Sequence, residues 1–374
     1  MSGKFARLVA ALCLSAYGLA AHAAYRMNLQ APATKEGVEV HDLHAIIMLI
    51  CVVIFVGVFG AMGYAMYAHR KSKGHAAAQF HENTMVEVLW TVIPFVILVL
   101  MAWPATRTLL VMRDTAQPDL TIKATGYQWK WGYQYLSGEG AGISFLSNLA
   151  TPSDEIYGDA KKDDHYLLEV DHPLVVPVGK KVRILTTGAD VIHSWFVPAL
   201  AVKQDANPGF IRDTWFRADK EGTYRGQCAE LCGALHGFMP IVVQVVSAEK
   251  YTAWVKEQKT KLASAAEDVN KTWDLASLKA RGEKVYQANC MACHQATGMG
   301  MPPTFPPLSG SKVVNGPKEA QIHLELTGKP GTAMASFKQL SDTDLAAVIT
   351  YVRNSWANKT GEVIQPAEIK AARK

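Results

Sequence analysis

Two long uncharged segments constrain the fold of this chain more than any other feature. Residues 44–68 contain no Asp, Glu, Lys or Arg, and neither do residues 88–106. As a helix, each segment is long enough to cross a bilayer whose hydrocarbon core is about 30 Å thick. The alternative, a buried helical hairpin of a soluble protein, fits these lengths and flanks less well. We therefore predict a two-helix transmembrane hairpin over residues 44–113, preceded by a short outer segment, residues 24–43.

The loop between the two segments sets their orientation. It carries a cluster of basic and titratable residues: His69, Arg70, Lys71 and Lys73. Positively charged loops remain in the cytoplasm, so both chain ends are expected on the outer side of the membrane.

The first 23 residues have the pattern of a secretory signal. Lys4 and Arg7 form the charged start, residues 8–19 the apolar centre, and Ala21-His22-Ala23 an A-x-A-like cleavage site. We predict a signal peptide over residues 1–23, with an uncleaved anchor as the alternative.

Residues 226–240, GQCAELCGALHGFMP, combine four metal-binding side chains in one short stretch: Cys228, Cys232, His236 and Met239. His193 is a fifth candidate, upstream in the segment ADVIHSWFVP. Thiolate, imidazole and thioether ligands suit copper better than hard cations. Two cysteines four residues apart could each bridge two ions, which makes a dinuclear site possible. A disulfide is the alternative, but it would leave the histidines and the methionine unexplained.

A second cofactor motif is Cys290-Met291-Ala292-Cys293-His294. C-x-x-C-H is the attachment site of a c-type haem, in which both thiols bond to the haem and the histidine ligates iron. A thioredoxin-like redox pair would need a βαβ context and has no use for the histidine. The other cysteines are Cys13 and Cys51, so no disulfide framework is expected.

Residues 119–246 are interrupted by Gly and Pro and rich in β-branched residues. The pattern predicts strands within five segments: residues 120–135, 165–170, 180–187, 213–218 and 241–246. Many short strands in this length favour a β-sandwich or a Greek-key barrel. The metal-binding stretch would then join the last two strands, and His193 would end an earlier one.

The C-terminal part of the chain is expected to be helical. Residues 250–272 contain no Pro or Gly and predict a helical or partly flexible linker. Over residues 273–358, helical spacing relates five apolar residues: Leu345, Val348, Ile349, Val352 and Trp356. Ser341 and Asp344 resemble a capping box, and Gly282 would let the first helix cross the last one closely. The charged tail, residues 359–374, is expected to be loose.

With these motifs, the chain resembles subunit II of the haem-copper cytochrome c oxidases, in the caa-type version with a fused C-terminal cytochrome c domain. The segments that carry the resemblance are VEVLWTVIPFVILV, GYQWKWGYQY, DVIHSWFVP, GQCAELCGALHGFMP and CMACH. The resemblance implies a transmembrane hairpin, an all-β cupredoxin-like sandwich over residues 114–249 and an all-α class I cytochrome c domain over residues 273–358.

The resemblance also implies a ligand set. A dinuclear copper A centre would be held by His193, Cys228, Cys232, His236 and Met239, with the backbone carbonyl of Glu230. The Glu230 side chain would reach a magnesium ion shared with subunit I. Trp129 matches the residue where electrons enter, and Glu87 matches a carboxylate at the mouth of a proton path. The alternatives are a core or interface aromatic for Trp129, a helix-end carboxylate for Glu87 and a solvated side chain for Glu230.

For the haem iron, His294 is the expected proximal ligand and a methionine the sixth. Four methionines are candidates: Met291, Met299, Met301 and Met334. Met291 lies on the proximal side, and class I cytochromes c place their methionine where Met334 stands, directly before the last helix. A carbonyl from residues 306–308 is expected to accept a hydrogen bond from the free ring nitrogen of His294.

The function implied is that of an electron-transfer subunit in a proton-pumping respiratory oxidase. Electrons would come from cytochrome c or a quinol-cytochrome c reductase, and would pass from haem c through copper A to subunit I. Oxygen would be reduced there, at haem a and copper B, with subunit III as a further partner. No feature indicates nucleic-acid binding. The alternative is a membrane-anchored copper-delivery or assembly protein.

Overall fold

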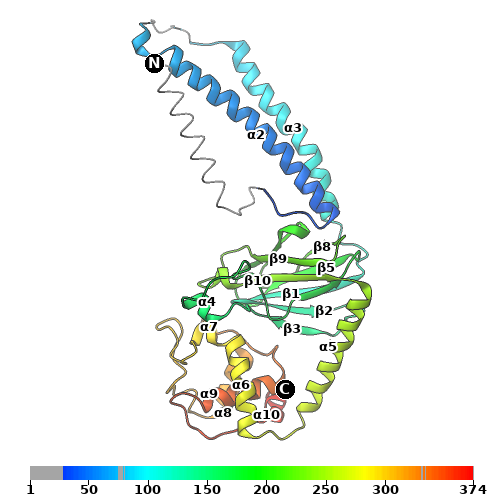
Figure 1. Cartoon of the computed structure of the whole chain (residues 1–374), viewed down its shortest axis with the longest axis vertical. Coiled ribbons are helices and arrows are strands. Elements are labelled where there is room, and N and C mark those ends of the chain that lie inside the picture. Colours follow the sequence, from blue (N-terminus) through cyan, green and yellow to red (C-terminus); the bar gives the residue numbers. More distant parts are fainter. Residues whose placement is uncertain (1–27, 75–78, 80, 330–331, 333, 374) are drawn as a thin grey trace. The chain divides into compact units, whose positions relative to one another are not determined.

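The computed structural model describes residues 28–373 apart from 75–78, 80, 330–331 and 333 (Figure 1). The predicted signal peptide, residues 1–23, lies outside the described residues. The chain divides into two units, residues 1–31 and residues 32–374, and every element described below belongs to the second.

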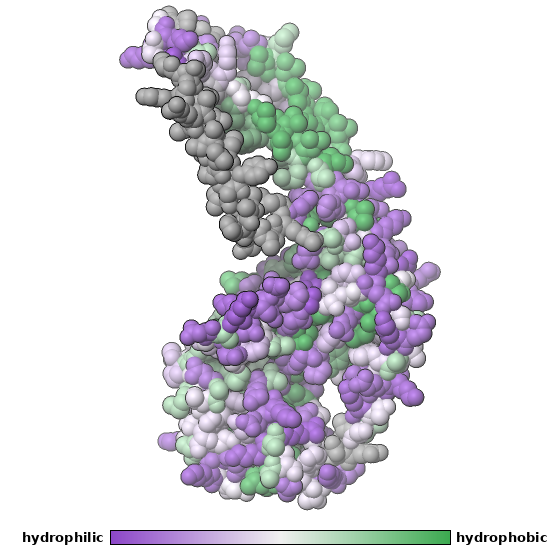
Figure 2. All heavy atoms as spheres, viewed as in Figure 1, coloured by the Kyte–Doolittle hydropathy of each residue, from purple (hydrophilic) through white to green (hydrophobic). Residues whose placement is uncertain are grey.

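Two long apolar helices come first, α2 (Lys35–Ala68) and α3 (Thr84–Met112), separated by the short helix η1 (Lys71–Lys73). Both helices extend beyond the uncharged segments because capping side chains begin them earlier. Thr34 accepts from the backbone N–H of Gly37, and Asn83 from that of Val86. Their apolar side chains are exposed along most of the length (Figure 2), as expected of helices that contact lipid.

A sandwich of two five-stranded sheets follows. One sheet has the order β3-β2-β1-β5-β8 and the other β4-β10-β9-β6-β7. The strands of the first sheet are β1 (Leu120–Tyr127), β2 (Lys130–Tyr135), β3 (Ser144–Ser147), β5 (Val182–Gly188) and β8 (Arg212–Phe216). Those of the second are β4 (Leu174–Pro177), β6 (His193–Val197), β7 (Val202–Ala206), β9 (Gly222–Cys228) and β10 (Pro240–Val246). Three short helices lie in the connections: α4 (Ser153–Tyr157), η2 (Pro198–Leu200) and η3 (His236–Phe238).

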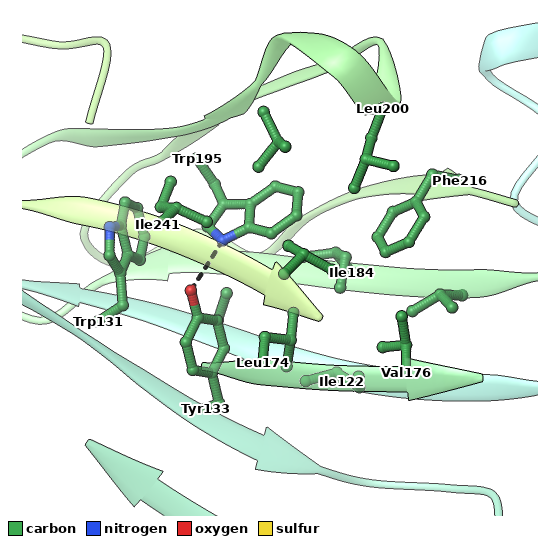
Figure 3. Packing of buried hydrophobic residues seen from close by; sticks show 14 of the residues in the cluster. Ile122, Trp131, Tyr133, Leu174, Val176, Ile184, Trp195, Leu200, Phe216 and Ile241 are labelled. Atoms are coloured by element: carbon green, nitrogen blue, oxygen red, sulfur yellow. Dashed lines mark hydrogen bonds between the residues drawn. The ribbon is translucent and has the colours of Figure 1, made fainter. Parts of the chain in front are cut away.

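The sandwich core contains large aromatic residues from both sheets (Figure 3). Trp195 stacks on Phe216, with ring centroids 6.2 Å apart, and its indole N–H donates to the hydroxyl of Tyr133 at 3.2 Å. On β5, Val182 and Ile184 are buried while Arg183 and Leu185 are half-buried, which is the alternation expected of a sandwich strand. This packed core gives the adjoining loops a rigid support.

The segment 165–170 is not a strand, contrary to the prediction. Its backbone turns, with Leu168 N–H donating to the carbonyl of His165, and Leu167 has a positive φ of 60°. Only an isolated bridge, between Val170 and Leu149, remains. The predicted segments also leave out β3, β4, β6, β7 and β9. Four of these strands have only four or five residues, and β9 contains Gly222 and Gly226, which weaken a strand pattern. β4 is buried throughout and pairs in parallel with β10, so it shows no alternation.

The predicted linker is the helix α5 (Ala248–Asp268). Its first turns are part of the sandwich, because Tyr251 and Val255 are buried in the same core. Trp254 lies 5.4 Å from the ring of Tyr135, measured between centroids. The beginning of α5 is therefore fixed rather than flexible.

The C-terminal module contains α6 (Leu275–Asn289), α7 (Met291–His294), α8 (Lys318–Thr327), α9 (Asp342–Arg353) and α10 (Pro366–Ala372). α6 crosses α9 closely at Gly282, where an added Cβ would lie 2.0 Å from the carbonyl oxygen of Ala347. Ser341 caps α9 by accepting from the N–H of Asp344 at 3.1 Å, as predicted. These contacts place the ends of α6 and α9 in one small core.

Two expectations for this module are wrong. The tail is not loose, since Ile364 and Ile369 are fully buried and α10 packs on α9. Trp356 is not on the same helix as Leu345 and Val352, because α9 ends at Arg353. Trp356 has a φ of 54°, and its indole N–H donates to the carbonyl of Ala296 at 3.0 Å.

Candidate metal and haem sites

The five predicted copper ligands come from two places in the sandwich. Cys228 ends β9, and the following loop carries Cys232, His236 and Met239 before β10 begins. His193 begins β6 rather than ending a strand. Because β6 pairs with β9 so that Trp195 lies opposite Cys228, His193 is brought beside the loop.

The ligand atoms of four of these residues converge. The two thiol sulfurs are 3.8 Å apart, Cys228 Sγ lies 3.9 Å from His193 Nδ1, and Cys232 Sγ lies 3.5 Å from His236 Nδ1. The ligand atoms of His193, Cys228 and Cys232 all lie within 4.8 Å of one another, as a metal site requires. Met239 is completely buried, and its carbonyl accepts from the N–H of Cys228 at 3.0 Å.

These donors fit copper in both chemistry and surroundings. Cys228 and Cys232 are 6% and 2% exposed, and His193 is fully buried. The hydrogen bond between the two thiols lowers the pKa of Cys228, and the same bond, with burial, raises the pKa of Cys232. A thiolate pair that shares a proton when metal-free is suited to bind soft cations in exchange for that proton.

Asp190 supports the site, although the sequence analysis did not single it out. Its Oδ1 lies 2.8 Å from His193 Nε2, and this bond leaves Nδ1 directed at Cys228. Burial lowers the pKa of His193, but the bonds to Asp190 and Cys228 outweigh it and raise the pKa. An acidic residue three positions before a predicted histidine ligand was the available signal.

The backbone carbonyl and the side-chain carboxylate of Glu230 have different surroundings. Its carbonyl oxygen is 3.4 Å from Cys228 Sγ, and its role as a backbone ligand stays a prediction. Its carboxylate is 44% exposed and lies 3.6 Å from Lys203 Nζ. The carboxylate is therefore accessible to solvent, and its role in binding magnesium stays a prediction.

Trp129 and Glu87 occupy different environments. Trp129 lies between β1 and β2, partly buried against the copper loop, where a Cβ on Gly233 would be 3.0 Å from its Cζ2. Glu87 is exposed in the first turn of α3, and its Oε1 accepts from the N–H of Asn83 at 3.1 Å. That contact matches the helix-end alternative; a role in a proton path stays a prediction.

The C-x-x-C-H motif forms the short helix α7, directly after α6. Cys290 ends α6, and its carbonyl accepts from the N–H of His294 at 2.9 Å, which places both thiols and the imidazole on one turn. His294 Nδ1 lies 3.0 Å from the carbonyl oxygen of Pro306, as expected, so Nε2 is left for iron. Burial lowers the pKa of His294 and keeps the ring neutral, while it raises the pKa of Cys293 to about 11. This geometry fits a covalently attached haem.

The candidates for the sixth iron ligand differ in their surroundings. Met299 is 54% exposed and Met301 39%, and the backbone of Met301 pairs with Phe305. Met334 is half-buried before α9, packs against the core of the module, and its carbonyl accepts from Lys329 at 2.9 Å. These contacts favour Met334, which stays a prediction.

Comparisons with known proteins match three regions of the chain. Three family models match: the transmembrane domain of cytochrome c oxidase subunit II over residues 22–108, its periplasmic domain over 120–246, and cytochrome c over 279–356. Cytochrome c oxidase subunit 2 of Cereibacter sphaeroides is 40% identical over 243 residues, which cover 62% of this chain and 79% of that protein. Cytochrome c oxidase subunit 2 of Metridium senile is 39% identical over 245 residues, which cover 65% of this chain and 94% of that protein.

Solved structures include the periplasmic domain of subunit II of cytochrome oxidase from Bradyrhizobium japonicum. It is 45% identical, with 39% of this chain and 98% of that chain covered and a TM-score of 0.35. A haem-copper terminal oxidase dimer matches at 14% identity, with 54% of this chain and 99% of that chain covered and a TM-score of 0.22. On the family models and the curated relatives, the chain belongs to the cytochrome c oxidase subunit II family and carries a cytochrome c domain after the sandwich.

Proposed function

We propose that this chain receives electrons at a covalent haem c, passes them through Trp129 to a dinuclear copper A centre, and delivers them to haem a in subunit I. The observation that carries the proposal is the convergence of the buried thiol pair with His193 and His236, in a chain that also carries C-x-x-C-H. Both groups, when bound, supply one-electron transfer.

The protein's own part in this function is to keep each ligand fixed. His193 is held by Asp190, the thiols belong to a loop between two paired strands, and His294 is oriented by Pro306. Ligands that stay in place while a metal changes oxidation state favour fast electron transfer. A methionine ligand at Met334 would raise the haem potential, as a carrier that donates to copper requires.

The rest of the assembly follows from the same proposal. Oxygen would be reduced in subunit I, next to subunit III, with protons entering near Glu87 and magnesium bound by the Glu230 side chain at the boundary. The hairpin of α2 and α3 would hold both electron-transfer domains on the periplasmic side of a bacterial inner membrane, within reach of cytochrome c or a quinol-cytochrome c reductase.

A copper-delivery protein is the less favoured alternative. Delivery needs copper that exchanges with a partner, yet His193, Cys228, Cys232 and Met239 are all buried. A covalent haem would have no purpose in such a protein. The oxidase subunit accounts for both sites.

The test is the metal content of the purified chain. We expect two copper ions and one haem per chain, and a mixed-valence EPR signal in which one electron is shared between two coppers. Cys228→Ser should abolish that signal, whereas the control Cys51→Ser, on the exposed surface of α2, should leave it unchanged. One copper per chain, or the signal of an isolated type-1 site, would contradict the dinuclear proposal.

A further inference from the structure

Gln128, next to Trp129, connects the two segments that carry the copper ligands. Its side-chain Nε2 donates to the carbonyl oxygen of Cys232 at 2.8 Å. Its backbone N–H donates to Oδ2 of Asp190, also at 2.8 Å. The other oxygen of Asp190 bonds to His193. One residue therefore braces the copper loop against the His193 segment.

The same residue determines where Trp129 lies. The indole N–H of Trp129 is buried and has no hydrogen-bond partner among the described residues, so no bond of its own fixes the ring. The ring packs on Gly233, directly after Cys232, and meets the ring of Phe305 edge to face, with centroids 6.3 Å apart. The bond between Gln128 and the Cys232 carbonyl holds the residue before Trp129 on the copper loop.

Gly233 permits this close approach. Its φ is +119°, and an added Cβ would lie 2.8 Å from Gln128 Nε2 and 3.0 Å from Trp129 Cζ2. A side chain at this position would therefore displace the amide and the indole together. The loop is shaped to receive both groups.

We propose that Gln128 is a positioning residue for electron transfer: its amide holds the indole of Trp129 against the copper loop at Cys232–Gly233. Electron tunnelling weakens steeply as the gap between donor and acceptor widens, so a loosely held indole would slow transfer into the copper pair. This inference rests on the proposed function, in which electrons from haem c reach copper through Trp129.

The test compares variants of the full chain loaded with haem and copper. Gln128→Met keeps the length of the side chain but removes the donor, and Gly233→Ala pushes on the amide and the indole. Gln134→Met is the matched control, because Gln134 is exposed on β2 and makes no side-chain hydrogen bond among those found in the described residues. Trp129→Phe serves as the reference for loss of the aromatic relay. Haem c is reduced by a light-activated reductant, and its reoxidation is followed together with the near-infrared absorbance of copper.

We expect Gln128→Met and Gly233→Ala to slow internal transfer by up to about tenfold, the factor by which one lost hydrogen bond shifts a conformational equilibrium. The copper content and the mixed-valence EPR spectrum should stay as in the wild type, and Gln134→Met should transfer electrons at the wild-type rate. A residue that only stabilised the copper loop would instead change copper content and EPR spectrum in proportion to the rate.

Two results would overturn the inference alone: wild-type transfer in Gln128→Met while Trp129→Phe is slow, or a slow Gln128→Met chain that has lost copper in proportion. Absence of transfer from haem c to copper in the wild type, or a normal rate in Trp129→Phe, would overturn the proposed function as well. The two failures are therefore distinguishable.

Discussion

At the scale of single residues, sequence motifs identify ligands but not the groups that orient them. The spacing of Cys228, Cys232 and His236 predicted a soft metal site, and the structure brings their ligand atoms together. Asp190 and Gln128 were missed because neither is a ligand. Asp190 bonds to His193 only three positions away, whereas Gln128 bonds to Asp190 and Cys232, which lie far from it in the sequence. The contacts of Gln128 depend on how strands pair, which no local pattern encodes.

The sixth haem ligand is a prediction at this scale. Met334→Ala should lower the haem reduction potential and open the iron to carbon monoxide, because a thioether ligand raises the potential and fills the sixth position. Met299→Ala and Met301→Ala, which alter exposed side chains, should do neither. The measurements are a redox titration and the spectrum under carbon monoxide. If Met301→Ala alone produced both changes, the assignment to Met334 would be wrong.

At the scale of elements, the alternation of apolar residues and the capping residues predicted strands and helices, but short strands could not be predicted. The segments of β1, β2, β5, β8 and β10 were predicted, and the buried face of β5 agrees with its sequence alternation. β4 and β6 are too short and too buried to alternate, and segment 165–170 has strand-like composition but turns at Leu167. The tail folds because Ile364 and Ile369 complete a core that its charge pattern does not reveal.

The crossing of α6 and α9 gives a prediction for stability. Gly282→Ala should destabilise the haem module by about 1–3 kcal/mol, because the added methyl overlaps the Ala347 carbonyl and forces the helices apart. Thermal unfolding followed by haem absorbance measures the effect. The control is Lys279→Ala on the exposed face of the same helix, which should change little. An unchanged melting temperature in Gly282→Ala would show that the helices do not cross this closely.

At the scale of the whole molecule, the order of modules was predictable because each has its own signature. The uncharged segments indicated the hairpin, and the cysteine motifs indicated the two cofactor sites. The β-branched segments, interrupted by Gly and Pro, indicated the sandwich. The family models match the hairpin, the sandwich and the cytochrome c domain. The sequence did not show that α5 begins as part of the sandwich, through Tyr251 and Val255. The surrounding sequence of α5 is charged, so the packing of Tyr251 and Trp254 against the sandwich is seen only in the structure.

The central claim is that every electron passes through the copper pair between haem c and oxygen. Its most direct test is stopped-flow reoxidation of haem c in the purified, assembled oxidase carrying His193→Asn or Cys232→Ser. The account predicts that an outside donor still reduces haem c in both variants, but that oxygen no longer reoxidises it. A copper-delivery protein would lose oxidase activity only through failed assembly, and added copper would restore it. Normal reoxidation in an assembled Cys232→Ser complex would contradict the relay.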